Sequence, residues 1–93
     1  MIEPSGKFEI TGHYELTGRG GFLIGRIVDG VIRIGMSVTT DLDPGELKIA
    51  GVEYLDNFSE GKYRNALIFA EKPSLEFVKR AFPVGIVIEV NDA

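Results

Sequence analysis

The chain has 93 residues, of which 12 are glycine and none is cysteine or tryptophan. This length fits a single domain, residues 1–93, with one small core and neither a disulfide nor a thiolate metal site. The hydrophobic fraction of 44% argues against a disordered chain, and the formal net charge of −4 gives no general attraction to phosphate backbones or anionic membranes.

Regular alternation of apolar and polar residues predicts a first strand over residues 6–16. One face is expected to be buried and carries Phe8, Ile10, Tyr14 and Leu16, with Gly12 among them. The other face is expected to meet solvent and carries Lys7, Glu9, Thr11, His13 and Glu15. A turn at 17–20 ends this strand, and the nearly continuous apolar run at 21–28 predicts a second strand that is covered on both faces.

The dipeptide Asp29-Gly30 lies between two apolar runs and predicts a two-residue hairpin turn, with a return strand over 31–34. A short strand is expected over 38–41. The sequence Asp43-Pro44-Gly45 then predicts a turn, because proline fixes φ and glycine tolerates a positive φ.

The next strand, residues 47–55, changes the parity of its apolar positions from odd to even. One extra residue near Ala50-Gly51 would absorb this change, so a β-bulge is predicted there. A polar loop over 57–62, a strand over 63–70, a helical segment over 73–80 that begins at Pro73, and a closing strand over 85–90 complete the chain.

Short, closely spaced strands with glycine at the corners predict an all-β fold. We expect a small closed β-barrel of six or seven strands, with one short helical turn near 74–80. Closure of the barrel removes the sheet edges that would otherwise favour aggregation.

No catalytic, cofactor-binding or metal-binding residue is predicted. The run Gly18–Gly21 lacks the pattern of a phosphate-binding loop and is followed by a strand, so a tight barrel corner is the better interpretation. The segment 41–46 resembles the start of a calcium loop, but its fifth position is Gly45 and its twelfth is Val52. His13 is the only histidine, and no motif places a nucleophile beside it. We therefore do not expect an enzyme.

The arginines allow a second interpretation. The basic residues of interest are Arg19, Arg26, Arg33, Lys62 and Arg64. Arg26 and Arg33 flank the predicted hairpin turn and are expected to lie close together. With Tyr14, Phe58 or Tyr63 they would form a basic and aromatic surface for RNA. The alternative is ordinary solvent-exposed strand arginines neutralised by neighbouring acidic residues, and we favour it.

Residues 16–35 read LTGRGGFLIGRIVDGVIRIG, and this stretch resembles the second, β-barrel domain of translational GTPases such as elongation factor Tu. The positions that match the family pattern without a gap are Gly18, Gly20, Gly25, Gly30 and Gly35, with Arg19 and Arg26. The strand at 47–54 and the glycines at 61 and 85 resemble later parts of the family, so the resemblance covers most of residues 7–90. It implies a barrel in which the five glycines serve at turns and close strand approaches.

In that family the barrel supports a GTPase domain and in some members contacts the acceptor end of tRNA. This chain has no phosphate loop, so GTP hydrolysis by the chain itself is not expected, and no tRNA-contacting residue is carried over. The sequence thus predicts a non-catalytic interaction module that binds protein, itself included. The alternative is an RNA- or ribosome-associated module that uses Arg19, Arg26 and Arg33, which the net charge does not favour.

Residues 1–6 lack the basic and apolar regions of a signal peptide. The longest apolar run, residues 82–88, is interrupted by Pro83 and Gly85 and is shorter than the roughly 18 residues of a membrane span. A cytoplasmic protein without membrane partners is therefore expected. Met1 and the full set of predicted strands favour a complete chain.

Overall fold

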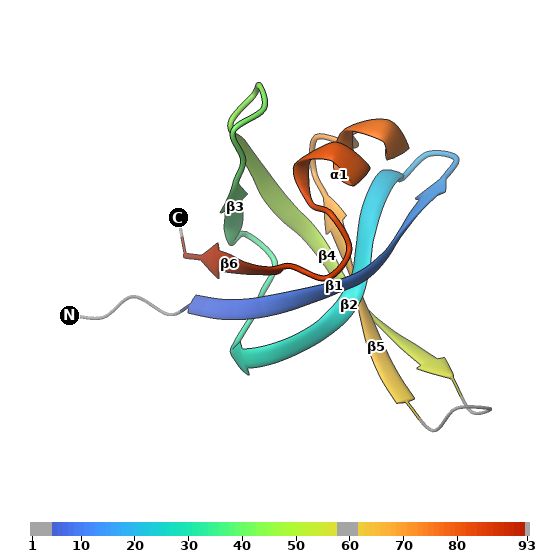
Figure 1. The fold of residues 1–93 in the computed structure, drawn as a ribbon, viewed down its shortest axis with the longest axis vertical. Helices are drawn as coiled ribbons and strands as arrows, with labels where there is room; N and C mark the ends of the chain where they lie inside the picture. The colour runs from blue at the N-terminus through green and yellow to red at the C-terminus, as the bar shows by residue number, and fades with distance from the viewer. Residues whose placement is uncertain (1–4, 58–61, 93) are drawn as a thin grey trace.

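The computed structural model describes residues 5–57 and 62–92, and these form an antiparallel barrel (Figure 1). The elements are β1 (Ser5–Leu16), β2 (Gly20–Gly30), β3 (Ser37–Thr39), β4 (Glu46–Asn57), β5 (Lys62–Phe69), α1 (Leu75–Ala81) and β6 (Val87–Asn91). The barrel closes in the order β1-β2-β5-β4-β3-β6. The predicted all-β closed barrel is confirmed, with six strands in the described part of the chain. The centre of the predicted loop at 57–62 lies outside the described residues.

The predicted hairpin turn at Asp29-Gly30 is wrong. β2 continues through both residues, and Asp29 and Gly30 pair with Lys7 and Gly6 of β1. The following residues, 31–34, form no strand. The physical reason is that β1 offers β2 a partner along its whole length, and an extra residue, Val28, lets β2 bend while the pairing continues.

The predicted bulge in β4 is confirmed. Ile49 lies opposite Phe69 and Gly51 lies opposite Ile68, so Ala50 is the extra residue. After this bulge, the residues of β4 that face the barrel interior change parity, as the sequence pattern requires.

A further bulge in β1 was not predicted. Ile10 pairs with Gly25 and Gly12 pairs with Ile24, which leaves Thr11 as the extra residue. Because one extra residue exchanges the two faces of a strand, the even-numbered residues after Thr11 leave the core. Tyr14 and Leu16 are consequently 52% and 42% exposed, which corrects the prediction that they share the buried face of Phe8 and Ile10.

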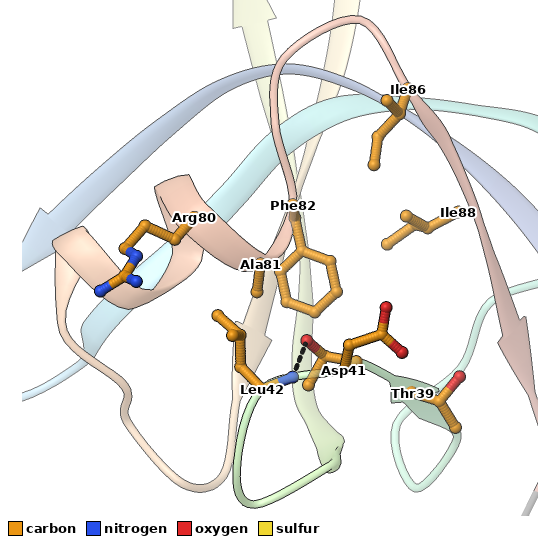
Figure 2. Close-up of a pocket in the computed structure, with 9 residues that line it drawn as sticks. Thr39, Asp41, Leu42, Arg80, Ala81, Phe82, Ile86 and Ile88 are labelled. Atoms are coloured by element: carbon orange, nitrogen blue, oxygen red, sulfur yellow. Dashed lines mark hydrogen bonds between the residues drawn. The ribbon is translucent and has the colours of Figure 1, made fainter.

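The short helix α1 covers one end of the barrel and confirms the helical segment predicted near 74–80 (Figure 1). The helix begins after Ser74 and not at Pro73, because the Ser74 side chain accepts a hydrogen bond from the Phe77 backbone N–H at 3.1 Å. Val78 of α1 is buried against the core. Phe82 follows the helix, at the beginning of the connection to β6, and its side chain is buried as well (Figure 2).

Replacing Ser74 by alanine is expected to lower the free energy of unfolding by about 0.5–2 kcal/mol, because the first turn of α1 loses its side-chain acceptor. Chemical denaturation followed by circular dichroism measures this change. The matched control is Ser74→Asp, which keeps an acceptor and should stay close to the wild type. Equal destabilisation by both variants would contradict a capping role.

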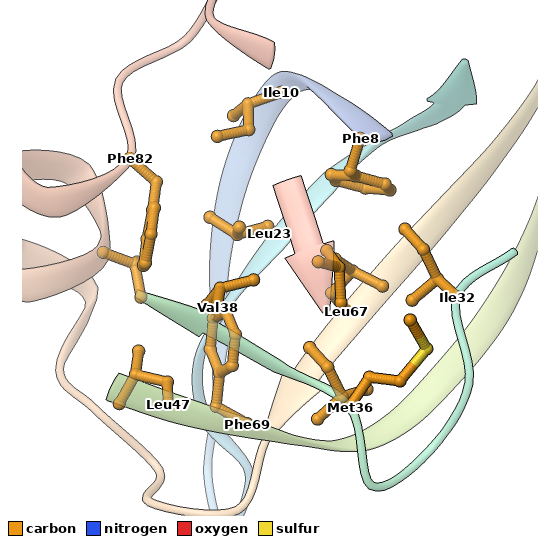
Figure 3. Packing of buried hydrophobic residues seen from close by; sticks show 13 residues of the cluster. Phe8, Ile10, Leu23, Ile32, Met36, Val38, Leu47, Leu67, Phe69 and Phe82 are labelled. Atoms are coloured by element: carbon orange, nitrogen blue, oxygen red, sulfur yellow. The ribbon is translucent and has the colours of Figure 1, made fainter. Parts of the chain in front are cut away.

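The core fills the barrel interior and continues under α1 (Figure 3). It contains side chains from all six strands, from α1 and from the connections after β2 and α1. Its fully buried members include Phe8, Ile10, Leu23, Leu67 and Phe69.

The predicted turn at 43–45 is also present, with the Gly45 N–H donating to the Leu42 carbonyl oxygen at 2.7 Å.

Candidate functional site

An apolar groove on the outside of the barrel is the candidate site. We call it the outer groove and define it by its lining residues, which are Tyr14, Leu16, Arg19, Phe22, Ile24, Glu53 and Ala66. Its volume is about 270 Å³. Leu23 and Leu67, the neighbours of Phe22 and Ala66 in sequence, are fully buried in the core. Because adjacent residues of a strand point to opposite faces, Phe22 and Ala66 lie on the outer face of the sheet, where they are themselves buried in a second, small cluster with Ile68.

The bulges in β1 and β4 create this groove. Beyond Thr11, β1 turns Tyr14 and Leu16 outward beside Phe22 and Ile24 of β2. Beyond Ala50, β4 places Glu53 opposite Ala66 on the same outer face. Without these two extra residues, the apolar side chains of β1 would continue into the core and the outer face would carry the polar set.

An aromatic pair forms one wall of the outer groove. The ring centroids of Tyr14 and Phe22 lie 5.8 Å apart, with an angle of 53° between the ring planes. This tilted arrangement is favourable between aromatic rings. Phe22 is nearly buried, whereas about half of Tyr14 stays accessible to a partner.

An ion pair borders the outer groove on the side away from the aromatic pair. Arg19, in the turn after β1, donates from Nη1 to the Glu53 Oε2 at 2.5 Å. Both side chains are partly exposed, so this pair contributes little to stability. The groove therefore offers apolar area with one charge of each sign at its rim.

The second predicted arginine, Arg26, lies in β2 and is also paired. Its Nε and Nη2 donate to the Glu9 Oε1 at 3.1 and 2.7 Å. Arg33 is exposed in the connection after β2. The hairpin that was expected to bring Arg26 and Arg33 together does not form, which removes the reason for placing them on one surface. Phe58 lies outside the described residues, and the side chain of Tyr63 is not described.

His13 does not face solvent as predicted. The bulge at Thr11 turns it inward, where it is half-buried and its Nε2 donates to the Phe82 carbonyl oxygen at 2.6 Å. Glu15 follows the same parity, and its Oε2 accepts a hydrogen bond from the Leu75 N–H at 3.0 Å. Both side chains thus join β1 to the segment around α1, and the sequence alternation concealed this role.

The predicted turn glycines serve several purposes. Gly18 and Gly35 lie in turns with φ of 85° and 98°. Gly20 begins β2 against the Lys72 backbone, and Gly30 ends it against the Ser5 carbonyl. Gly25 is not at a turn. It lies inside β2, where a Cβ would overlap the Glu9 carbonyl oxygen, so close strand approach requires glycine there.

The glycine-rich turn has the barrel-corner geometry that the sequence favoured. Gly21 packs against the Ser74 backbone, and its N–H donates to the Pro73 carbonyl oxygen at 2.5 Å. The Gly21 N–H is therefore already paired within the protein and is not available to a phosphate group. The turn leads directly into β2.

Within the ranges that the structure describes, no group of three or more His, Cys, Asp or Glu side chains is placed to hold a metal ion. Across the same ranges, no helix has the length and apolar character needed to cross a bilayer.

The outer groove is thus built from side chains whose placement depends on the bulges in β1 and β4. No protein-family model, curated protein or solved structure matches this chain.

Proposed function

We propose that this chain is a non-catalytic module that binds another protein through the outer groove, a second copy of itself included. The observation that carries the proposal is the exposure of Tyr14 and Leu16 on the outer face of the barrel, beside the buried Phe22. Aromatic side chains with an accessible apolar face are enriched at protein interfaces, and a charged rim around an apolar centre is the common arrangement there. A partner would fill the groove with apolar side chains and meet Arg19 and Glu53 at its rim.

The charge distribution favours a protein partner over RNA. Binding to a phosphate backbone requires cations that are free to replace counterions. Arg19 and Arg26 are each engaged by a carboxylate, Glu53 and Glu9, and the whole chain carries a net charge of −4. We also propose that the chain is related to the second, β-barrel domain of translational GTPases and that it is cytoplasmic. Neither proposal identifies the partner.

The variant Leu16→Glu tests the outer groove by placing a carboxylate on its apolar wall. Self-association is measured by sedimentation velocity over a concentration series, and partners are measured by cross-linking in the source cell. We expect Leu16→Glu to weaken the interaction at least about tenfold, since a charge would be buried without a partner. The matched control is Ile34→Glu, which makes the same kind of change at an exposed position in the connection after β2.

A monomer whose cross-linked partners are the same with and without Leu16→Glu would overturn the proposal. A titration with fluorescent single-stranded RNA at low salt separates the alternative. RNA binding that is lost in Arg26→Ala and kept in Leu16→Glu would replace the protein-binding proposal with the RNA-binding one.

A further inference from the structure

The barrel closes between β3 and β6 through a single residue pair. These neighbouring strands pair only at Ser37 and Asn91, whereas β6 pairs with β1 along its whole length. Figure 1 shows β3 and β6 meeting at one end and diverging from there. We call the space between them the wedge. It lies at the opposite edge of β6 from β1 and shares no lining residue with the outer groove.

Backbone groups of β6 point into the wedge. The Ile10 N–H donates to the Ile86 carbonyl oxygen at 3.0 Å, so the backbone groups of residue 86 face β1. Because alternate residues of a strand direct their backbone groups to the same neighbour, those of residues 88 and 90 also face β1. The backbone N–H and C=O groups of Val87 and Glu89 therefore face the other way, toward β3. Over the described residues, no strand pairs with them on that side.

The opposite wall of the wedge, formed by β3, also carries unpaired backbone groups. The Ile49 N–H donates to the Met36 carbonyl oxygen at 2.7 Å, and the Thr40 N–H donates to the Gly45 carbonyl oxygen at 2.9 Å. Residues of β3 with even numbers therefore face β4, and the backbone groups of Thr39 face the wedge. Two walls of unpaired strand backbone are a template for an added strand.

The wedge has room for such a segment. A pocket of about 450 Å³ lies between the two strands and α1, in the size range of small-molecule pockets and so large enough for a single side chain. Phe82 is buried at its base, and Ile88 of β6 and Leu42 are half-buried beside it (Figure 2). An apolar side chain that entered the pocket would cover these three groups.

Two charged residues, Asp41 and Arg80, line the pocket of the wedge, and they differ in direction. The Asp41 carboxylate points toward the centre of the pocket, and the Arg80 guanidinium points away from it (Figure 2). No ion pair among the described residues involves Asp41. Glu89, on the wall formed by β6, is exposed. A cationic side chain would therefore complement this pocket better than an anionic one.

We propose that the wedge binds an extended peptide segment of a partner protein, which adds a strand to the free edge of β6. Its backbone pairs with Val87 and Glu89. An apolar side chain covers Phe82 and Ile88, and a neighbouring Lys or Arg meets Asp41. Main-chain pairing supplies affinity in this mode, and the pockets for alternate side chains supply specificity. The interaction is independent of the outer groove.

Selection from a displayed library of random linear peptides, followed by ¹⁵N NMR titration of the full chain, tests this proposal. We expect enriched peptides to combine apolar residues with Lys or Arg, and to shift the amide signals of Thr39, Val87 and Glu89. Asp41→Lys should weaken the selected peptides at least about tenfold, since like charges then meet in the pocket. Asp43→Lys is the matched control, because it changes the same charge two residues away at an exposed position outside the pocket and should leave affinity unchanged.

The peptide affinities of two further variants test the strand pairing and the independence of the two surfaces. Val87→Pro removes one backbone donor that faces the wedge while leaving the pairing with β1 in place, and it should weaken the peptides as well. Leu16→Glu in the outer groove should have no effect. Equal affinity in wild type and Asp41→Lys, or peptide-induced shifts confined to the outer groove, would overturn the proposal. Concentration-dependent shifts of Thr39, Val87 and Glu89 without peptide would also overturn it, because the occupant would then be a second copy.

Discussion

Replacing Gly25 by alanine is expected to destabilise the barrel by about 3 kcal/mol or more. A Cβ at this position would overlap the Glu9 carbonyl oxygen and lie 2.8 Å from the ring of Phe8. The first of these neighbours is strand backbone, which moves only if the pairing of β1 with β2 moves too. The second is fully buried in a densely packed core, where little space is available for relaxation.

Gly12→Ala is the matched control for Gly25→Ala. Gly12 lies in β1 on the facing strand, and the nearest atom to an added Cβ is the Ile24 Cβ at 3.9 Å, an ordinary contact distance. Its alanine variant should be as stable as the wild type or up to about 1 kcal/mol more stable, because alanine restricts the unfolded chain. Thermal and urea unfolding measure both variants. Similar stability of the two would contradict the close strand approach at Gly25.

Truncation of Phe69 to alanine is the second change with a large expected effect, a loss of about 3–5 kcal/mol. Phe69 is fully buried, and its ring stacks on that of Phe82 with centroids 5.9 Å apart and an angle of 24° between the planes. The variant loses the transfer free energy of the ring and leaves a cavity where β5 meets the segment after α1. Since small domains have only about 5–15 kcal/mol of total stability, a fraction of the molecules should unfold at moderate temperature.

The conservative variant Phe69→Leu separates cavity formation from disruption of β5. Leucine keeps an apolar side chain of intermediate size, so its loss of stability should be clearly smaller than that of alanine. Urea unfolding followed by circular dichroism gives the midpoint and the slope for each variant. A loss in Phe69→Ala below about 1 kcal/mol would show that the ring is not part of a tightly packed core.

The outer groove and the wedge are related by the way the barrel bends. At the groove, the extra residue in β1 turns Tyr14 and Leu16 outward, and the extra residue in β4 places Glu53 on the same face, without interrupting either strand. At the wedge, β3 has only three residues and cannot pair with the full length of β6. The groove thus follows from bulges within paired strands and the wedge follows from a short strand, so variants at one should leave the other unaffected.

The two bulges show how far the sequence pattern reaches. In β4, the apolar positions pass from Ile49 to Val52, and this change of parity is visible in the sequence, so the bulge at Ala50 was predicted. In β1, the alternation continues without interruption from Ile10 to Tyr14, so nothing in the sequence marks the bulge at Thr11. Only the pairing of β1 with β2 shows that an extra residue is present. The exposure of Tyr14 and the partial burial of His13 follow from that pairing.

Local sequence alone determined the features that arise within a few neighbouring residues. Alternation, turn residues and a helix-start proline are short-range signals, and they predicted most strands, the turn at 43–45, the helical segment and the all-β class. Tertiary structure decided the features that join residues distant in the chain. These are the continuation of β2 past Asp29-Gly30, the pairing of Arg19 with Glu53 and of Arg26 with Glu9, and the wedge. The physical reason is that each depends on which strands become neighbours and in what register, and register is set by the packing of the whole barrel.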